Sequence, residues 1–249
     1  MKRTPIVVAI FLLSLALLAN SESRAATYTT NFPLAAKPLS ETGNWINGKA
    51  NGLDWADVQI VTAGLACGTE SGSGGYDDST AILTGTWGPN QTAQATVYTT
   101  NQQTGSVYEE VELRLRSAIS AHSNTGYEIN FRCIKGGGYV QIVRWNGPLG
   151  SYTYVTEGGN NNYQGIKTGD VISASINGNL IIGYVNGMEV IRGTDSTYTS
   201  GSPGIGFFLQ GGTSTLNSNF GFSSFSVSDG VSSSTQPPSN AKVTMTLAP

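Results

Sequence analysis

Apolar and polar residues alternate along this chain in short stretches, and turn residues separate one stretch from the next. A two-residue period is that of a β-strand with one buried face, and no long stretch has the period of a helix. The expected strands are YTTNF, DVQIV, TAQATVYT, EEVELRLRSA, GYEINFRC, GYVQIVRW, SYTYVT, DVISASI, NLIIGYV, MEVIRG, GIGFFLQ and FSSFSVS. Since each apolar face must be covered, the pattern predicts an all-β protein, a two-sheet antiparallel β-sandwich or jelly roll.

Two of the joints between strands carry the pair Asn-Gly, at Asn177-Gly178 and Asn186-Gly187. This pair supplies the positive φ values of a type I′ turn. The segment 170–193 is therefore predicted to be a three-stranded meander.

The two ends of the chain differ in composition from its middle. Lys2 and Arg3 precede the apolar run PIVVAIFLLSLALLA, and Ser23 and Ala25 suit a signal peptidase, so we expect residues 1–25 to be a signal peptide. The apolar run is too short for a membrane helix, which needs roughly 20 residues. We expect a secreted or periplasmic protein with one β domain over 26–229 and a Ser/Pro-rich tail or linker over 230–249.

The formal net charge of −3 and the low share of charged residues, 12%, argue against nucleic acid and anionic membranes as partners, because both require basic patches. The two cysteines, Cys67 and Cys133, are either one disulfide or two buried thiols. With His122 as the single histidine, a histidine-based metal cluster is excluded. We expect no cofactor and a monomer.

The most unusual stretch is YEEVELRLR, residues 108–116. Alternation places Val111, Leu113 and Leu115 on one face of a strand, and the charged residues on the other. The stretch YEINFRC behaves in the same way, so a hairpin of the two would gather one polar patch. Its members are Glu110, Glu112, Arg114, Arg116, Glu128, Asn130 and Arg132.

The second half of the chain carries a family resemblance. GYEINFRC, YVQIVRWNG and KTGDVISASINGNLIIGYVNGMEVIRGTDSTYTSGSPGIGFF together resemble the concanavalin A-like lectin/glucanase superfamily, in particular the bacterial laminin-G-like jelly rolls. The resemblance covers 90–228 well and 27–89 only loosely. It implies the fold but not the activity, because the superfamily includes lectins, carbohydrate-binding modules, glycosidases, polysaccharide lyases and adhesion domains.

The polar patch allows three interpretations. It is a salt-bridged, solvated sheet face, a glycan-binding face whose carboxylates and guanidinium groups hold sugar hydroxyls or uronates, or an acid/base site built on Glu110, Glu112 and Glu128. Flanking arginines should keep the carboxylates ionised, whereas a general acid needs a raised pKa. The Glu-x-Asp-x-x-Glu strand of laminarinase-like relatives is not matched at Glu110, and the alginate-lyase-like Gln-x-His is not matched at Gln141. No catalytic residue is therefore assigned.

Aromatic residues supply a second indication of glycan binding, because sugar rings stack on exposed side chains. Trp145 and Tyr163 lie beside the loops NGPLG and GGNNNYQG, where exposure is expected. The alternative is that Tyr139, Val143 and Trp145 line one strand face and are mostly core.

Glu70, Asp77 and Asp78 lie in the glycine-rich stretch TESGSGGYDDST and offer oxygen ligands of the kind calcium prefers. The stretch lacks the spacing of a known calcium loop, so we expect a plain loop, with a structural calcium ion as the alternative. The sequence thus favours an exported carbohydrate-binding domain of the lectin type. The alternatives are a glycoside hydrolase or polysaccharide lyase, and a protein-interaction or adhesion domain.

Overall fold

A computed structural model of the chain describes residues 25–62, 64–75, 78–100, 106–133, 138–157 and 165–230. Nearly all of the predicted signal peptide and tail, as well as Asp77 and Tyr163, lie outside the described residues. The strands and the two short 3₁₀ helices are β1 (Thr27–Thr30), β2 (Trp45–Asn47), η1 (Lys49–Asn51), β3 (Gln59–Thr62), β4 (Leu65–Cys67), β5 (Asp78–Leu83), β6 (Gln91–Thr99), β7 (Tyr108–Ser120), β8 (Ser123–Arg132), β9 (Val140–Gly147), β10 (Tyr152–Glu157), β11 (Val171–Asn177), β12 (Leu180–Val185), β13 (Met188–Thr194), β14 (Ser202–Gln210), η2 (Ser214–Asn219) and β15 (Phe220–Ser228).

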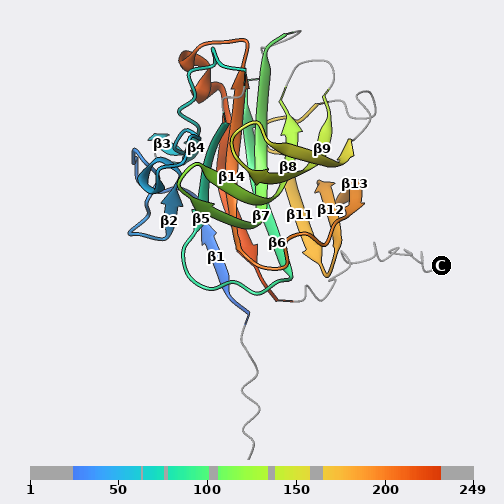
Figure 1. The fold of residues 1–249 in the computed structure, drawn as a ribbon. Helices are drawn as coiled ribbons and strands as arrows, with labels where there is room; N and C mark the ends of the chain where they lie inside the picture. Colours follow the sequence, from blue (N-terminus) through green and yellow to red (C-terminus); the bar gives the residue numbers. More distant parts are fainter. Residues whose placement is uncertain are drawn as a thin grey trace, which may run out of the picture.

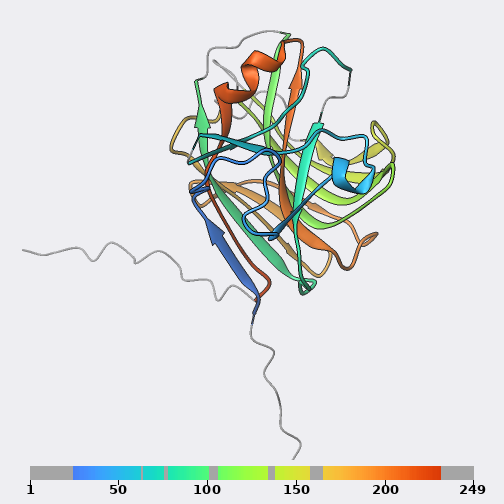
Figure 2. The ribbon, with the colours of Figure 1, turned by 90° about the vertical axis from the view of Figure 1, so that its left-hand side faces the viewer.

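The strands form two antiparallel sheets that pack face to face (Figures 1 and 2). The eight-stranded sheet has the order β13-β12-β11-β6-β15-β4-β3, with β1 paired to β15. The seven-stranded sheet has the order β10-β9-β8-β7-β14-β5-β2. The predicted two-sheet sandwich is confirmed.

The core between the sheets is made by the apolar positions of the alternating strands. On β7 these are Val111, Leu113 and Leu115, all fully buried, as expected. The eight-stranded sheet supplies the facing side chains, among them Ala93, Ala95, Val97, Phe222 and Phe225. The even-numbered residues of β7 up to Arg114 consequently lie on the side of the seven-stranded sheet that is turned away from the core, which we call the outer face.

The predicted meander is present as β11, β12 and β13. At Asn186-Gly187 both residues have positive φ, 50° and 77°, as a type I′ turn requires. At the first joint Asn177 pairs with Leu180, so Gly178 and Asn179 form the turn, and only Gly178 has a positive φ. That turn is of the II′ kind, because the loop begins one residue later than the Asn-Gly pair indicates.

Among the strands not predicted, β5 matters most for function. Its first three residues end the glycine-rich stretch TESGSGGYDDST, which the sequence predicts to be a loop, and no strand is predicted over the remaining three. In the structure β5 pairs with β14 and is buried along its whole length. Asp78, its first residue, thereby belongs to the seven-stranded sheet.

Of the two alternatives for the cysteines, the structure contains the buried thiols: Cys67 and Cys133 are both free. Burial raises the pKa of the Cys67 thiol to about 12 and that of the Cys133 thiol well above its usual range. None of the helices among the described residues is long and apolar enough to cross a membrane.

Free thiols give a direct prediction. We expect the unfolded, unreduced protein to react with two equivalents of a thiol reagent, the native protein to react slowly, and a reductant to leave the melting temperature unchanged, because reactivity requires an accessible thiolate. A titre of zero thiols, together with a melting temperature lowered by reductant, would show a disulfide instead.

Candidate functional site

The hairpin of β7 and β8 gathers the predicted polar patch on the outer face. The cross-strand pairs are Glu110–Arg132, Glu112–Asn130 and Arg114–Glu128. The prediction of one patch is therefore confirmed for these six residues, but not for Arg116.

The patch is not a solvated face, however. Glu112 and Arg114 are fully buried, and Glu110, Glu128 and Asn130 are each at most 5% exposed. Part of the cover comes from a distant segment: Leu53 and Trp55, which follow η1, pack on Val143 and Trp145 of β9. In Figure 2 the blue η1 segment lies beside the yellow-green strands of this sheet. The expectation of exposed cross-strand ion pairs is wrong, because a sheet alternation cannot show what covers its second face.

Arg114 is the centre of the buried patch. Its Nη2 donates to Glu112 Oε2 at 2.6 Å, and its Nη1 lies 3.0 Å from Glu128 Oε2. Burial lowers the pKa of this guanidinium, but the neighbouring carboxylates outweigh that effect and raise it. Arg114 is therefore a permanent positive charge shared by two carboxylates, and not a guanidinium available to a ligand.

A glycine in the next strand makes room for this arrangement. Gly206 of β14 lies between Thr80 and Glu112 in the sheet. A Cβ atom on Gly206 would lie 2.2 Å from Glu112 Oε2 and 2.7 Å from Arg114 Nε. The side chains of β7 thus occupy the space above β14 that a side chain would otherwise fill.

Asp78 joins the patch from β5. One carboxylate oxygen from each of Asp78, Glu112 and Glu128 can be chosen so that the three atoms lie within 4.8 Å of one another. Glu70, the other described residue of the proposed calcium loop, is not part of this group. Glu70 and Asp78 therefore do not form a shared set of metal ligands. The group does not fit a calcium ion either, because the Arg114 guanidinium already contacts two of its three carboxylates and is the neutralising cation.

Burial changes the titration of these carboxyls. It raises the pKa of Asp78 and Glu112 well above their usual range, with the charge of Glu128 adding to the effect. It also raises the pKa of Glu110 to about 8, although a hydrogen bond from the Tyr139 hydroxyl acts in the opposite direction. For Glu110 and Glu112 desolvation raises the pKa by more than the nearby arginines lower it, so the expectation that flanking arginines keep these two pKa values low is wrong.

Several polar atoms of this face have no hydrogen-bond partner among the described residues although they are buried. They are Glu112 Oε1, Asn130 Oδ1, Thr80 Oγ1, Arg114 Nε and Trp55 Nε1. Buried polar groups are nearly always paired in proteins. Their accessible surface is almost nil, so they do not contact a ligand directly, and the accessible part of the outer face is the rim beside them.

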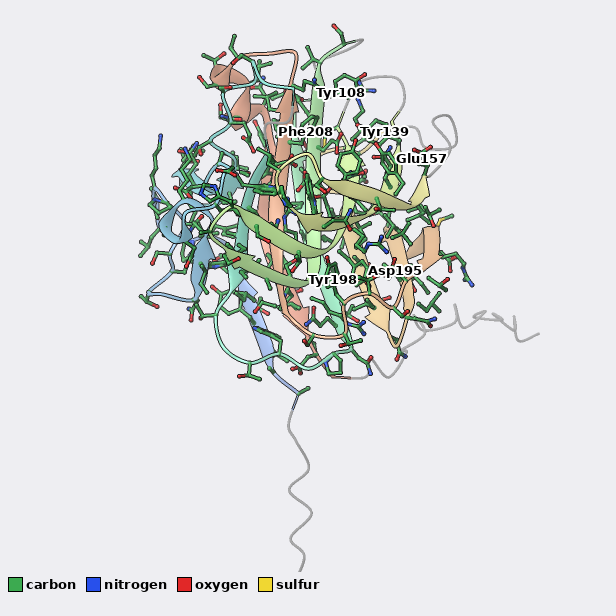
Figure 3. All side chains as sticks on the ribbon, viewed as in Figure 1. Tyr108, Tyr139, Glu157, Asp195, Tyr198 and Phe208 are labelled. Atoms are coloured by element: carbon green, nitrogen blue, oxygen red, sulfur yellow. The ribbon has the colours of Figure 1, made fainter. Side chains whose placement is uncertain are left out.

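An aromatic rim lies at the end of the patch where β7 begins. Tyr108, Tyr139 and Phe208 are half-buried there, and Figure 3 shows them together at the upper end of β7. The Arg132 guanidinium carbon lies 4.1 Å from the centre of the Tyr108 ring and 5.4 Å from that of Tyr139. Arg132 Nη2 also donates to the Val107 carbonyl at 2.9 Å. Rings, a guanidinium and carboxyls therefore meet at this end of the outer face.

Sequence reasoning missed this rim, although one signal was present. Tyr108 precedes Glu110 by two residues and so continues the same alternating face. Tyr139 was considered only as core, and Phe208 gave no signal because its side chain reaches the patch only through the pairing of β14 with β7.

Trp145 is not an exposed sugar-stacking residue. It is 3% exposed, its Nε1 donates to Glu128 Oε2 at 2.6 Å, and its ring centre lies 5.0 Å from that of Trp55. It lies on the outer face rather than between the sheets, so it belongs to a small second core. The alternative of a mostly buried strand face is correct for Val143 and Trp145, whereas Tyr139 is only half-buried.

Arg116 does not join the patch. Its φ of 48° and a register shift between Leu115 and Ala118 mark a β-bulge, which turns the side chain away from the alternating pattern. The guanidinium instead donates to three backbone carbonyls, those of Pro89, Tyr198 and Gly178. Arg116 therefore ties loops together and is not a ligand-binding residue.

Comparison with known proteins identifies the fold. Neither a protein-family model nor a curated protein sequence matches the chain. Among solved structures, the carbohydrate recognition domain of Emp46p matches 82% of this chain and 97% of its own, with 14% identity and a TM-score of 0.54. β-Agarase A in complex with oligoagarose matches 82% and 93%, with 8% identity and a TM-score of 0.51. An endo-β-galactosidase from Clostridium perfringens matches 81% and 62%, with 10% identity and a TM-score of 0.51. The chain is thus an antiparallel jelly roll with the concanavalin A-like fold.

Proposed function

We propose that the protein is an exported carbohydrate-binding domain that holds a glycan at the Tyr108–Tyr139–Phe208 rim. The observation that supports this most is the rim itself, three half-buried rings beside the Arg132 guanidinium. Rings offer apolar faces to sugar C–H groups, and convergent polar groups fix the orientation of the hydroxyls. The fold neighbours include a carbohydrate recognition domain and an agarase with bound oligoagarose, which fits the proposal.

The charges of the patch favour a neutral glycan over a uronate. Arg114 is paired with two carboxylates and Arg116 with backbone carbonyls. Of the three arginines that the sequence offers for this face, only Arg132 is half exposed at the rim. The rim therefore offers a uronate a single guanidinium, and the neighbouring carboxyls, whose pKa values are raised, provide no further cation for it.

The second candidate is a polysaccharide-cleaving enzyme, and two observations favour it. Glu110 has a pKa raised to about 8, as a general acid requires. Carboxylate oxygens of Glu112 and Glu128 approach within 4.8 Å, near the roughly 5–5.5 Å separation of retaining glycosidases. Against it, the same two carboxylates are bound to Arg114 and almost inaccessible, which leaves neither free as a nucleophile.

One experiment tests both candidates. The purified protein is incubated with insoluble neutral and uronate-containing polysaccharides, and the bound protein and the released reducing or unsaturated ends are measured in the same tubes. Retention on neutral polymers without released ends supports the binding domain. Released ends that disappear in Glu112→Gln would establish the enzyme, and neither signal would move the assignment to a protein-interaction domain.

Removal of one rim ring should weaken binding without affecting the fold. We expect Tyr108→Ala to lower the affinity for the retained polysaccharide roughly tenfold, about 1.4 kcal/mol, because a stacking surface is lost. Tyr184→Ala is the matched control, since Tyr184 is also half-buried but lies on the eight-stranded sheet. Equal binding isotherms of the two variants would remove the rim from the proposal.

A further inference from the structure

Backbone and side-chain hydrogen bonds join Ala26, near the start of the domain, to Asp229, near its end. Ala26 N donates to Asp229 Oδ1 at 2.6 Å, and Asp229 N donates back to the Ala26 carbonyl at 3.1 Å. The second carboxylate oxygen of Asp229 accepts a hydrogen bond from Gly88 N at 2.6 Å. The carboxylate thus lies between the two backbone nitrogens of Ala26 and Gly88.

The pairing of β1 with β15 fixes the position of Ala26 relative to Asp229. The ladder between β1 and β15 begins at the next residue, where Thr27 pairs with Ser228, and continues to Thr30 opposite Phe225. Ala26 N is therefore held at the carboxylate by the register of two strands.

We propose that Asp229 is the binding site for the α-ammonium group created when the Ala25–Ala26 peptide bond is cleaved. This is the bond at which the sequence predicts a signal peptidase to act. In the hydrolysis a water molecule gives its hydroxyl to the Ala25 carbonyl carbon and a proton to the Ala26 nitrogen. The new terminus is protonated at neutral pH, because its pKa is about 7.7–8.0.

Cleavage replaces the neutral amide donor of this hydrogen bond with an ammonium group, so a charge–charge attraction is added to the existing contact with the Asp229 carboxylate. The shallow depression around Ala26 is lined by Thr27, Tyr28, Asn44, Leu83, Thr84, Gly85, Thr86 and Trp87. Of these only Tyr28 is titratable, and its hydroxyl donates to Glu41, so Asp229 is the charged group that faces the new terminus.

The consequence is that signal-peptide cleavage stabilises the folded domain in addition to releasing it. A chain that begins at Ala26 should be more stable than the same chain with a blocked terminus, and the contact should hold the two ends of the domain together. A terminus created one residue earlier or later would not place its charge on the nitrogen that contacts Asp229.

The test compares two preparations of residues 26–249, one with a free α-amino group and one acetylated at Ala26. At pH 6.5 we expect the free form to melt about 2–4 °C higher, the shift that roughly 1 kcal/mol produces in a domain of this size. At pH 10.5, where the amine is neutral, the difference should vanish. In Asp229→Asn the free and acetylated forms should melt at the same temperature at both pH values. Each variant is compared with its own acetylated form, so a general loss of stability does not affect this difference.

The mass of the protein after export provides an independent check, with a mature chain expected to begin at Ala26. An unchanged melting temperature on acetylation, a difference that persists in Asp229→Asn, or a terminus at another residue would overturn the proposal. None of these outcomes depends on whether the rim binds a glycan.

Discussion

Replacing Arg114 with methionine should destabilise the protein by about 3–5 kcal/mol at pH 7.5, the cost of removing one partner from a buried ion pair. This is the largest loss of stability that we predict for the protein. The variant keeps much of the side-chain volume but leaves Glu112 and Glu128 buried without their cation. An uncompensated carboxylate in a low-dielectric environment is costly, and it responds by taking up a proton. The loss should therefore be smaller at pH 5 than at pH 7.5.

Urea unfolding at the two pH values measures this effect. Arg192→Met is the control, because Arg192 pairs with Glu189 at an exposed position and its removal should leave the midpoint essentially unchanged. If Arg114→Met unfolds like the control, the guanidinium is not the charge that holds this patch together.

The second large effect concerns Glu110 and pH. Its folded pKa of about 8 lies well above the value of about 4.3 in an unfolded chain, so between these values the folded state binds more protons. The free energy of unfolding must then fall as pH rises, by about 1.4 kcal/mol per pH unit for one full proton. This penalty is absent below about pH 4 and complete above about pH 8.

Glu110→Gln tests the contribution of this proton to the pH dependence of stability. The amide still accepts the hydrogen bond from Tyr139 but cannot ionise. Relative to the parent, we expect the variant to gain stability progressively from pH 5 to pH 8, as measured by denaturant unfolding. Glu189→Gln, at an exposed position, should show no such gain. A parallel pH dependence of parent and Glu110→Gln would mean that Glu110 is ionised in the folded protein.

The fold was largely predictable because strand alternation is a local property. The two-residue period of YEEVELRLR and YEINFRC correctly placed Val111 and its neighbours in the core and assembled Glu110, Glu112 and Asn130 into one patch. The Asn-Gly pairs likewise identified the meander, because turn geometry is encoded in two residues.

The burial of the patch could not be predicted, because it depends on residues far away in the chain. Trp55 covers it from near the end of the first quarter of the sequence, and Asp78 reaches it through β14, which lies between β5 and β7. Arg116 departs from the alternating pattern because a β-bulge turns its side chain away from the patch. Alternation says which residues share a face, but not what lies above that face.

Gly206 makes the buried Glu112–Arg114 pair of the outer face sensitive to substitution, whereas the aromatic rim is not. The floor of the proposed site depends on a position that has no side chain, so almost any substitution there displaces the Glu112–Arg114 pair. Tyr108, Tyr139 and Phe208 lie near strand ends, where exchange of one ring for another leaves that pair untouched. Related proteins could therefore diverge in the sugar they prefer by changing the rim alone, while the charged floor beneath it stays constant.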